Sequence, residues 1–213
     1  PAKWDVPRNE GIYQLLKNDP AVHVLHVGRL APNKKIEDII KVFYYLTKIS
    51  EAPAKLWLVG HDIDTELYSF ALKRLVRELD IVDAVNFVGR RDDTEVRALY
   101  EASEIYLCMS EHEGFCCPVI EAMHFGLPVI AYAATALPDT VGDAAILVKE
   151  KRYPEIAEII NQLHLDHQLR ERLIAAGHQR VAALSFQGFE RRVSQIFFPL
   201  NAGKIDPRQI SAS

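Results

Sequence analysis

The sequence predicts an α/β fold, built as a doubly wound, mostly parallel sheet of six strands. Short apolar runs alternate along the chain with longer stretches whose apolar residues recur at helical spacing, which is the pattern of repeated strand–helix units. Three of the runs end directly on a glycine (Gly28, Gly60 and Gly89), and a glycine there marks a turn after the strand. With 213 residues, 49% of them hydrophobic, the chain is long enough to bury one complete core.

The first strand–helix unit is predicted at residues 22–49. Residues 22–27 form a short apolar run that stops at Gly28, as expected of a buried strand followed by a turn. In residues 35–49 apolar side chains recur every three or four positions, which predicts an amphipathic helix. Pro53 interrupts this spacing, so the helix is expected to end before it.

Two further units follow the same plan. Residues 56–59 are predicted to be the second strand, and residues 67–79 a second amphipathic helix. Residues 85–88 repeat the strand pattern. Asp92 and Glu95 then have the spacing of a capping box, which predicts that another helix begins there.

The second half of the sheet is predicted from three apolar runs, at residues 105–109, 128–132 and 144–148. Pro118 lies between the first two, and proline is favoured in the first turn of a helix. Helical spacing resumes at Tyr153 and continues toward the C-terminus. Because strands alternate with helices and crossovers are right-handed, the chain is expected to form a Rossmann-like domain with helices on both faces. Ligands of such domains bind beyond the carboxyl ends of the strands.

Composition and charge set the domain plan and exclude some classes of protein. We expect a leading segment at residues 1–20, one domain over residues 21–200 and a polar, mobile tail at residues 201–213. The net charge of −4 argues against a nucleic-acid partner, which requires a basic face. No apolar run approaches the roughly 20 residues that span a bilayer. Three cysteines, two of them adjacent, indicate a reducing compartment and hence a cytoplasmic location.

The stretch from Ser110 to Ala131 has the order expected of a ligand site. Glu113 follows the fourth predicted strand, and Glu121 lies one turn into the helix that Pro118 begins. Backbone N–H groups at a helix N-terminus bind anions, so both carboxylates can face one ligand held there.

Two cations follow the first predicted strand. Arg29 lies on the turn, and Lys34 lies at the start of the next helix. Positive side chains at a helix N-terminus are disfavoured unless an anion is near, so the pair predicts a phosphate site. The alternative interpretation is a solvated loop followed by a charged first turn.

Taken in order, these segments resemble a known family. Residues 28–34, 85–89 and 110–129 are similar to the C-terminal, nucleotide-sugar-binding half of retaining glycosyltransferases with the GT-B fold, glycosyltransferase family 4. The match covers roughly residues 20–200. The resemblance implies that the chain binds a nucleotide-diphosphate sugar for transfer of a hexose to an acceptor. It also implies that this chain is one half of an enzyme and that the isolated domain is inactive.

The resemblance also implies a role for each matching residue. Arg29 and Lys34 would hold the donor diphosphate and, with Glu113 beside the transferred sugar, make up the catalytic set. Glu121 would accept hydrogen bonds from the ribose hydroxyls. Backbone N–H groups would bind the phosphate and the sugar, and two arginines would lie beside the base. The further donor-binding residues would thus be Gly28, Arg90, Arg91, Gly114, Phe115, Cys116 and Cys117.

Partners and cofactors follow from the same resemblance. In this family cations of the protein do what a metal does elsewhere, so neither a metal nor a cofactor is expected. An N-terminal, acceptor-binding Rossmann-like domain, absent from this sequence, is the expected partner, and any peripheral membrane contact would be made through it. The alternative function is a non-catalytic, regulatory module that binds a nucleotide or a sugar nucleotide.

Three departures from the family pattern concern glycines. The family usually has Gly-Phe-Gly followed by an apolar residue, and here Cys116 and Cys117 stand at the second glycine and at that apolar position. Lys35 replaces the glycine after the lysine. Thr135 begins a segment where a glycine-rich turn is common. A side chain at Cys116 is expected either to clash with a close ligand or to narrow the sugar pocket.

Two other features favour structural roles. Asp62 and Asp64 form an Asp-x-Asp pair of the kind that binds divalent cations in other glycosyltransferases, but Asp64 is interpreted as the cap of the following helix. His23 and His26 are three residues apart on a strand and point to opposite faces. They are interpreted as packed or hydrogen-bonded histidines.

Overall fold

The structure, a computed structural model, describes residues 2–185 of the chain. One parallel sheet has the strand order β3-β2-β1-β4-β5-β6. The strands are β1 (Val22–Val27), β2 (Ala54–Val59), β3 (Val85–Gly89), β4 (Ile105–Cys108), β5 (Val129–Tyr132) and β6 (Ile146–Val148). The predicted fold class is confirmed. Because the strand order reverses between β1 and β4, a crevice is expected at the carboxyl ends of these two strands.

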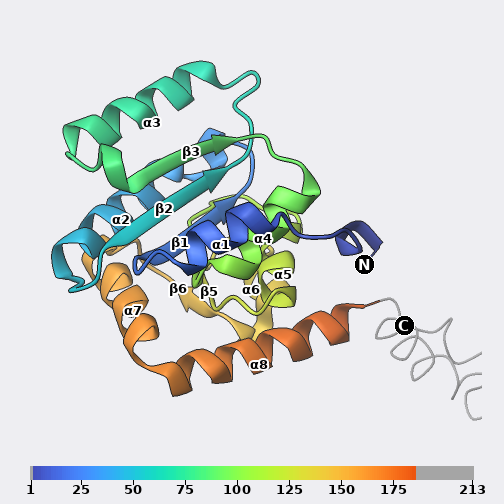
Figure 1. Cartoon of the computed structure of the whole chain (residues 1–213). Coiled ribbons are helices and arrows are strands. Elements are labelled where there is room, and N and C mark those ends of the chain that lie inside the picture. The colour runs from blue at the N-terminus through green and yellow to red at the C-terminus, as the bar shows by residue number, and fades with distance from the viewer. Residues whose placement is uncertain (1, 186–213) are drawn as a thin grey trace, which may run out of the picture.

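Helices cover both faces of the sheet (Figure 1). They are α1 (Glu10–Lys17), α2 (Ile36–Ile49), α3 (Glu66–Glu78), α4 (Asp93–Ala102), α5 (Cys117–His124), α6 (Leu137–Val141), α7 (Tyr153–Leu165) and α8 (His167–Leu184). Side chains of α2, α3 and α7 build the core on one face, and those of α4, α5 and α6 build the core on the other. Val24 joins the first core and Leu25 the second, as alternation along a strand requires.

The N-terminal segment contains a helix that the sequence did not predict. Asn9 caps α1 by accepting a hydrogen bond from the N–H of Ile12, and the helix packs on α4. Trp4 is 5% exposed and lies edge-on to Tyr100 and Phe125, with ring centroids 5.7 and 5.1 Å apart. Residues 2–20 therefore contribute to the core. With only one fully buried residue, α1 is too short for its apolar spacing to be recognised in the sequence.

Local details confirm some predicted boundaries and correct others. Asp92 forms the predicted capping box with Glu95. Asp64 is not the cap of α3, because Thr65 holds that position and Asp64 has a left-handed backbone with φ 62°. The helical stretch after Tyr153 divides at Asp166, which caps α8 through the N–H of Leu169.

Two further expectations concern the C-terminal tail and membrane-spanning segments. The predicted tail at residues 201–213, and the end of the predicted domain, lie outside the described residues. In the described part of the chain no helix combines the length and the hydropathy needed to cross a bilayer.

Candidate functional site

A cavity of about 240 Å³ lies at the carboxyl ends of β1, β2 and β3. Gly28 and Arg29 come from the turn after β1, and Gly60 from the turn after β2. Arg90, Arg91 and Glu121 complete this part of the lining. The cavity thus brings together five residues that the sequence predicted for one site: Gly28, Arg29, Arg90, Arg91 and Glu121.

The charges around this cavity favour an anionic ligand. Arg29 and Arg90 are exposed, and neither makes a side-chain hydrogen bond or ion pair with any residue in the range 2–185. Within the same range, the one ion pair of Arg91 is long, with 3.9 Å between its Nε and Oε1 of Glu95. Unpaired guanidinium groups that converge on one hollow are suited to a phosphate, which they bind through several N–H donors.

Lys34 and Glu113 are not in the lining of this cavity, but they form an ion pair with each other. The two residues are far apart in the chain, yet Lys34 Nζ is 2.6 Å from Glu113 Oε1. Their side chains are 20% and 8% exposed, so this pair is more shielded from water than a surface pair. The turn after β1 is also tied to the turn after β4, because the carbonyl of Asn33 accepts hydrogen bonds from Glu111 and Ser110. The predicted catalytic residues Lys34 and Glu113 are therefore in contact.

Helix α5 begins in this region and carries Glu121. Pro118 lies in its first turn, as predicted, and Gly114 and Phe115 are exposed just before it. Glu121 accepts a hydrogen bond from the Tyr100 hydroxyl at 3.1 Å and pairs with Lys3 Nζ at 3.1 Å. Burial, followed by the charge of Glu121, raises the pKa of Tyr100, so its hydroxyl stays protonated and donates to the carboxylate. Sequence reasoning missed Tyr100 and Lys3, because no pattern links either of them to Glu121.

Three residues around the site have left-handed backbones although none is glycine. They are Lys35, Cys116 and Thr135, with φ of 52°, 61° and 46°. All three occur where the sequence departs from the glycines of the pattern it resembles, and glycine is the residue that adopts this conformation most readily. Thr135 also contacts the site, since its Oγ1 accepts from the N–H of Glu113 at 2.9 Å and donates to the carbonyl of Glu113 at 3.0 Å. The hydroxyl of Thr135 therefore holds the backbone that carries Glu113.

The two adjacent cysteines have different surroundings. Cys117 is exposed at the start of α5, whereas Cys116 is buried directly before it. A hydrogen bond between the thiols of Cys116 and Cys108 lowers the pKa of Cys108 and raises that of Cys116. The side chain of Cys116 points into the core.

His26 is a buried histidine at the end of β1. Its Nδ1 lies 3.0 Å from the carbonyl of Leu107, so Nδ1 carries the proton. Its Nε2 has no partner among the described residues. The interpretation of His26 as a packed residue is confirmed, but only one of its two ring nitrogens is hydrogen-bonded. Burial lowers the pKa of His26 to about 4.

This pKa predicts a loss of stability in mild acid. An unfolded histidine has a pKa of 6.5, so between pH 6.5 and about pH 4 the unfolded chain binds a proton that folded His26 does not. The contribution to the free energy of unfolding, about 3 kcal/mol, is present above this range and is lost as the pH falls through it. We expect His26→Asn, which keeps an N–H donor for Leu107, to flatten this part of the pH profile measured by urea unfolding. Equal slopes for the two proteins between those pH values would contradict the prediction.

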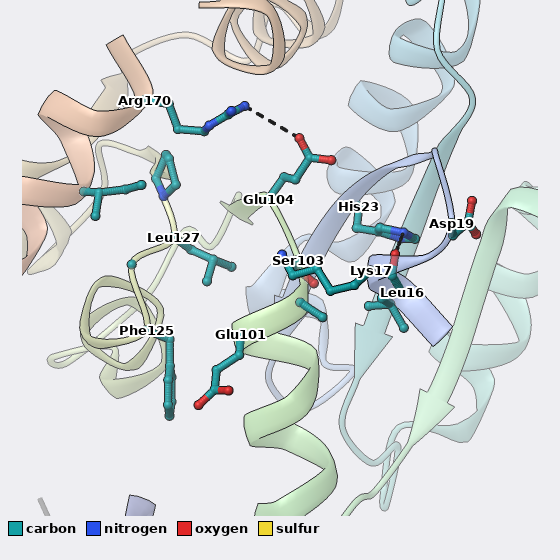
Figure 2. A pocket seen from close by; sticks show the side chains of 14 residues that line it. Leu16, Lys17, Asp19, His23, Glu101, Ser103, Glu104, Phe125, Leu127 and Arg170 are labelled. Carbon is teal, nitrogen blue, oxygen red and sulfur yellow. Dashed lines mark hydrogen bonds and ion pairs between the residues drawn. The ribbon is translucent and has the colours of Figure 1, made fainter. Parts of the chain in front are cut away.

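A larger cavity, of about 370 Å³, lies at the opposite ends of the strands (Figure 2). Its acidic residues are already paired. Glu104 lies 3.7 Å from Arg170, as Figure 2 shows, while Asp19 pairs with Lys55 and Glu101 with Arg97. His164 also binds Glu104, at 2.9 Å. None of the predicted site residues lines this cavity. The volume of a cavity alone therefore does not identify the candidate site.

The fold defines the class of protein: the chain has the fold of the C-terminal domain of GT-B glycosyltransferases. The class can be narrowed to a family. The pattern of the glycosyl transferases group 1 matches residues 8–180, and the chain belongs to this family.

Individual relatives agree with this assignment. An uncharacterized glycosyltransferase of Haemophilus influenzae is 40% identical over 109 residues, which are 51% of this chain and 29% of that protein. The N-acetyl-alpha-D-glucosaminyl L-malate synthase of Bacillus anthracis is 28% identical over 152 residues, 70% of this chain and 38% of the synthase.

Solved structures share the fold. Sucrose-phosphate synthase from Thermosynechococcus elongatus has a TM-score of 0.74 and 28% identity over 93% of this chain and 51% of the synthase. An Anabaena protein solved in complex with UDP and glucose has a TM-score of 0.71 and 22% identity over 89% of this chain and 53% of its own. The chain therefore spans about half the length, or less, of the relatives it matches.

Proposed function

We propose that this chain binds the donor in a retaining glycosyltransferase that moves a hexose from a nucleotide-diphosphate sugar to an acceptor. The observation that carries the proposal is the convergence of unpaired Arg29 and Arg90 on the cavity that also holds Glu121. The Lys34–Glu113 pair adjoins this region through the turn that follows β1. The family and the UDP complexes of structural neighbours support a sugar nucleotide as the ligand.

The reaction requires stabilisation of two opposite charges. Negative charge builds on the leaving diphosphate, and Arg29, Lys34 and the N–H groups at the start of α5 would stabilise it as it forms. Positive charge develops on the sugar ring, and the carboxylate of Glu113 would stabilise that charge and orient the sugar hydroxyls. In this mechanism the cations serve in place of a metal, and Glu113 is not a nucleophile.

The nucleotide would occupy the remaining part of the cavity. Glu121 would accept hydrogen bonds from the ribose hydroxyls, in which case the ribose replaces Lys3 as its partner. Tyr100 would keep Glu121 oriented during this exchange. Arg90 and Arg91, on the turn after β3, would lie beside the base.

The acceptor would come from outside this chain. Because the chain spans about half of its relatives, we propose an additional N-terminal Rossmann-like domain that binds the acceptor and closes the active site. Transfer would then require both halves, and the isolated chain would bind the donor without transferring the sugar. A peripheral membrane contact through that domain, and a cytoplasmic location, stay predictions.

The donor site is tested by titrating UDP and GDP into the protein in a calorimeter. We expect Arg29→Ala to weaken nucleoside diphosphate binding by about tenfold or more, because each hydrogen bond from a charged donor contributes about 1.5–3 kcal/mol. The melting temperature is expected to stay unchanged, since Arg29 has no partner within the described chain.

The matched control is Arg74→Ala on α3. Arg74 is exposed, and its only ion pair among residues 2–185 is with Glu78. This variant should bind UDP and GDP as the unchanged protein does. Absence of binding by the unchanged protein at millimolar nucleotide would refute the proposed function. So would an Arg29→Ala variant with undiminished affinity.

A further inference from the structure

Two thiols and a carboxylate form a compact cluster between the end of β4 and the start of α5. Cys108 ends β4, Cys116 precedes α5, and Glu113 lies on the loop between them. One ligand atom of each residue lies within 4.8 Å of the other two, and all three are buried. No other group of potential metal ligands is this close in residues 2–185.

The separations are close to those that a bound cation requires. Zinc–sulfur and zinc–oxygen bonds of about 2.3 and 2.1 Å in a tetrahedron place neighbouring ligand atoms roughly 3.5–3.8 Å apart. A side-chain adjustment on the order of 1 Å would bring the three atoms to these distances. Lys34 binds Oε1 of Glu113, and Oε2 makes no hydrogen bond within the described chain. The second oxygen can therefore be offered to a cation.

The type of ligand atom selects the type of cation. Two thiolates favour zinc and other thiophilic ions over magnesium or calcium, which prefer oxygen. Three protein ligands leave the fourth tetrahedral position open, as in exchangeable zinc sites. Binding releases one proton from each thiol, so its affinity should rise with pH.

We propose that Cys108, Glu113 and Cys116 form a binding site for a thiophilic divalent cation such as Zn²⁺, and that occupancy of this site blocks sugar-nucleotide use. Coordination takes the carboxylate of Glu113 away from the sugar position and adds positive charge beside Lys34. The inhibition rests on the proposed function, whereas the binding itself does not. Cys116, which replaces the glycine of the family pattern, is the residue that creates the site.

The test uses the full-length protein, reduced and freed of metal, with Co²⁺ as a spectroscopic probe. We expect one Co²⁺ per chain, with the near-ultraviolet charge-transfer absorption that thiolate ligands give. Cys108→Ala and Cys116→Gly should each weaken binding by at least about tenfold, since even indirect partners of a metal contribute that much. Cys116→Gly is expected to fold, because glycine suits the φ of 61° at this position.

Cys117→Ala is the matched control, because Cys117 is adjacent, exposed and outside the cluster. It should keep the full cobalt spectrum. Absence of thiolate absorption in the fully reduced protein would overturn the proposal, as would a spectrum that survives in a protein carrying both Cys108→Ala and Cys116→Gly. A loss of the spectrum in Cys117→Ala alone would place the site elsewhere and would also overturn it.

The inhibitory consequence has a separate readout. Zn²⁺ is expected to lower the rate of sugar transfer from a UDP-sugar by the unchanged protein. It is expected not to change the rate measured for Cys116→Gly. If the protein fails to bind any nucleotide, the proposed function fails, while the cobalt titration still decides whether the cation site exists.

Discussion

Replacement of Glu113 by alanine in the full-length protein is expected to lower kcat for sugar transfer by about 10²- to 10³-fold, the range measured when one electrostatic stabiliser is removed. Affinity for the nucleoside diphosphate should not fall. Glu113 pairs with Lys34 at 2.6 Å, so removing the carboxylate leaves the lysine free to bind a phosphate. Steady-state kinetics and calorimetry on the same preparations separate the two effects.

Glu111→Ala is the control for this experiment. Glu111 lies two residues away, is 47% exposed and pairs with Lys35 and Lys151, so its loss should leave kcat near that of the unchanged protein. Glu113→Gln, which keeps the size of the side chain, should behave like Glu113→Ala. Transfer that persists without Glu113 would favour the alternative, in which this site only binds a nucleotide and the chemistry is carried elsewhere.

The sequence predicted the strands and the edge of the sheet at which the site lies for one physical reason. In a parallel sheet every strand delivers its following turn to the same edge, so the Gly28, Gly60 and Gly89 turns had to meet. Periodicity and topology therefore placed Arg29 at this edge without knowledge of side-chain contacts. Arg90 and Arg91 were assigned to the site through the family resemblance.

Contacts that depend on side-chain geometry could not be predicted. Nothing in the spacing pairs Lys3 with Glu121, or places the Thr135 hydroxyl on the backbone of Glu113. The glycine departures showed where the sequence differs from the family, but not that Lys35 and Cys116 keep a left-handed backbone. Glycine is favoured at such positions because it adopts a positive φ without steric cost. Other residues can adopt the same φ where contacts in the surrounding structure offset the backbone strain.

Gly60 shows the opposite case, a position where only glycine fits. A Cβ on Gly60 would lie 1.9 Å from the carbonyl oxygen and 2.6 Å from the carbonyl carbon of Gly28. Both are backbone atoms, and they are held by hydrogen bonds from Gly28 N–H to Val59 and from Leu30 N–H to His61. The turn after β1 cannot move away without breaking its connection to β2.

We therefore expect Gly60→Ala to lower the free energy of unfolding by about 3 kcal/mol or more, equivalent to a fall in melting temperature of roughly 6–12 °C for a chain of this size. Gly89→Ala is the matched control. Gly89 also has a positive φ, of 73°, but a Cβ there would meet no atom within 4 Å, so only the conformational cost of about 1 kcal/mol is expected. If both variants melt at the same temperature, the positive φ alone explains why residue 60 is a glycine. If Gly60→Ala is the less stable variant, the close approach of the turns after β1 and β2 explains the need for glycine. The affinity for UDP should then also fall in that variant, because Arg29 moves with Gly28.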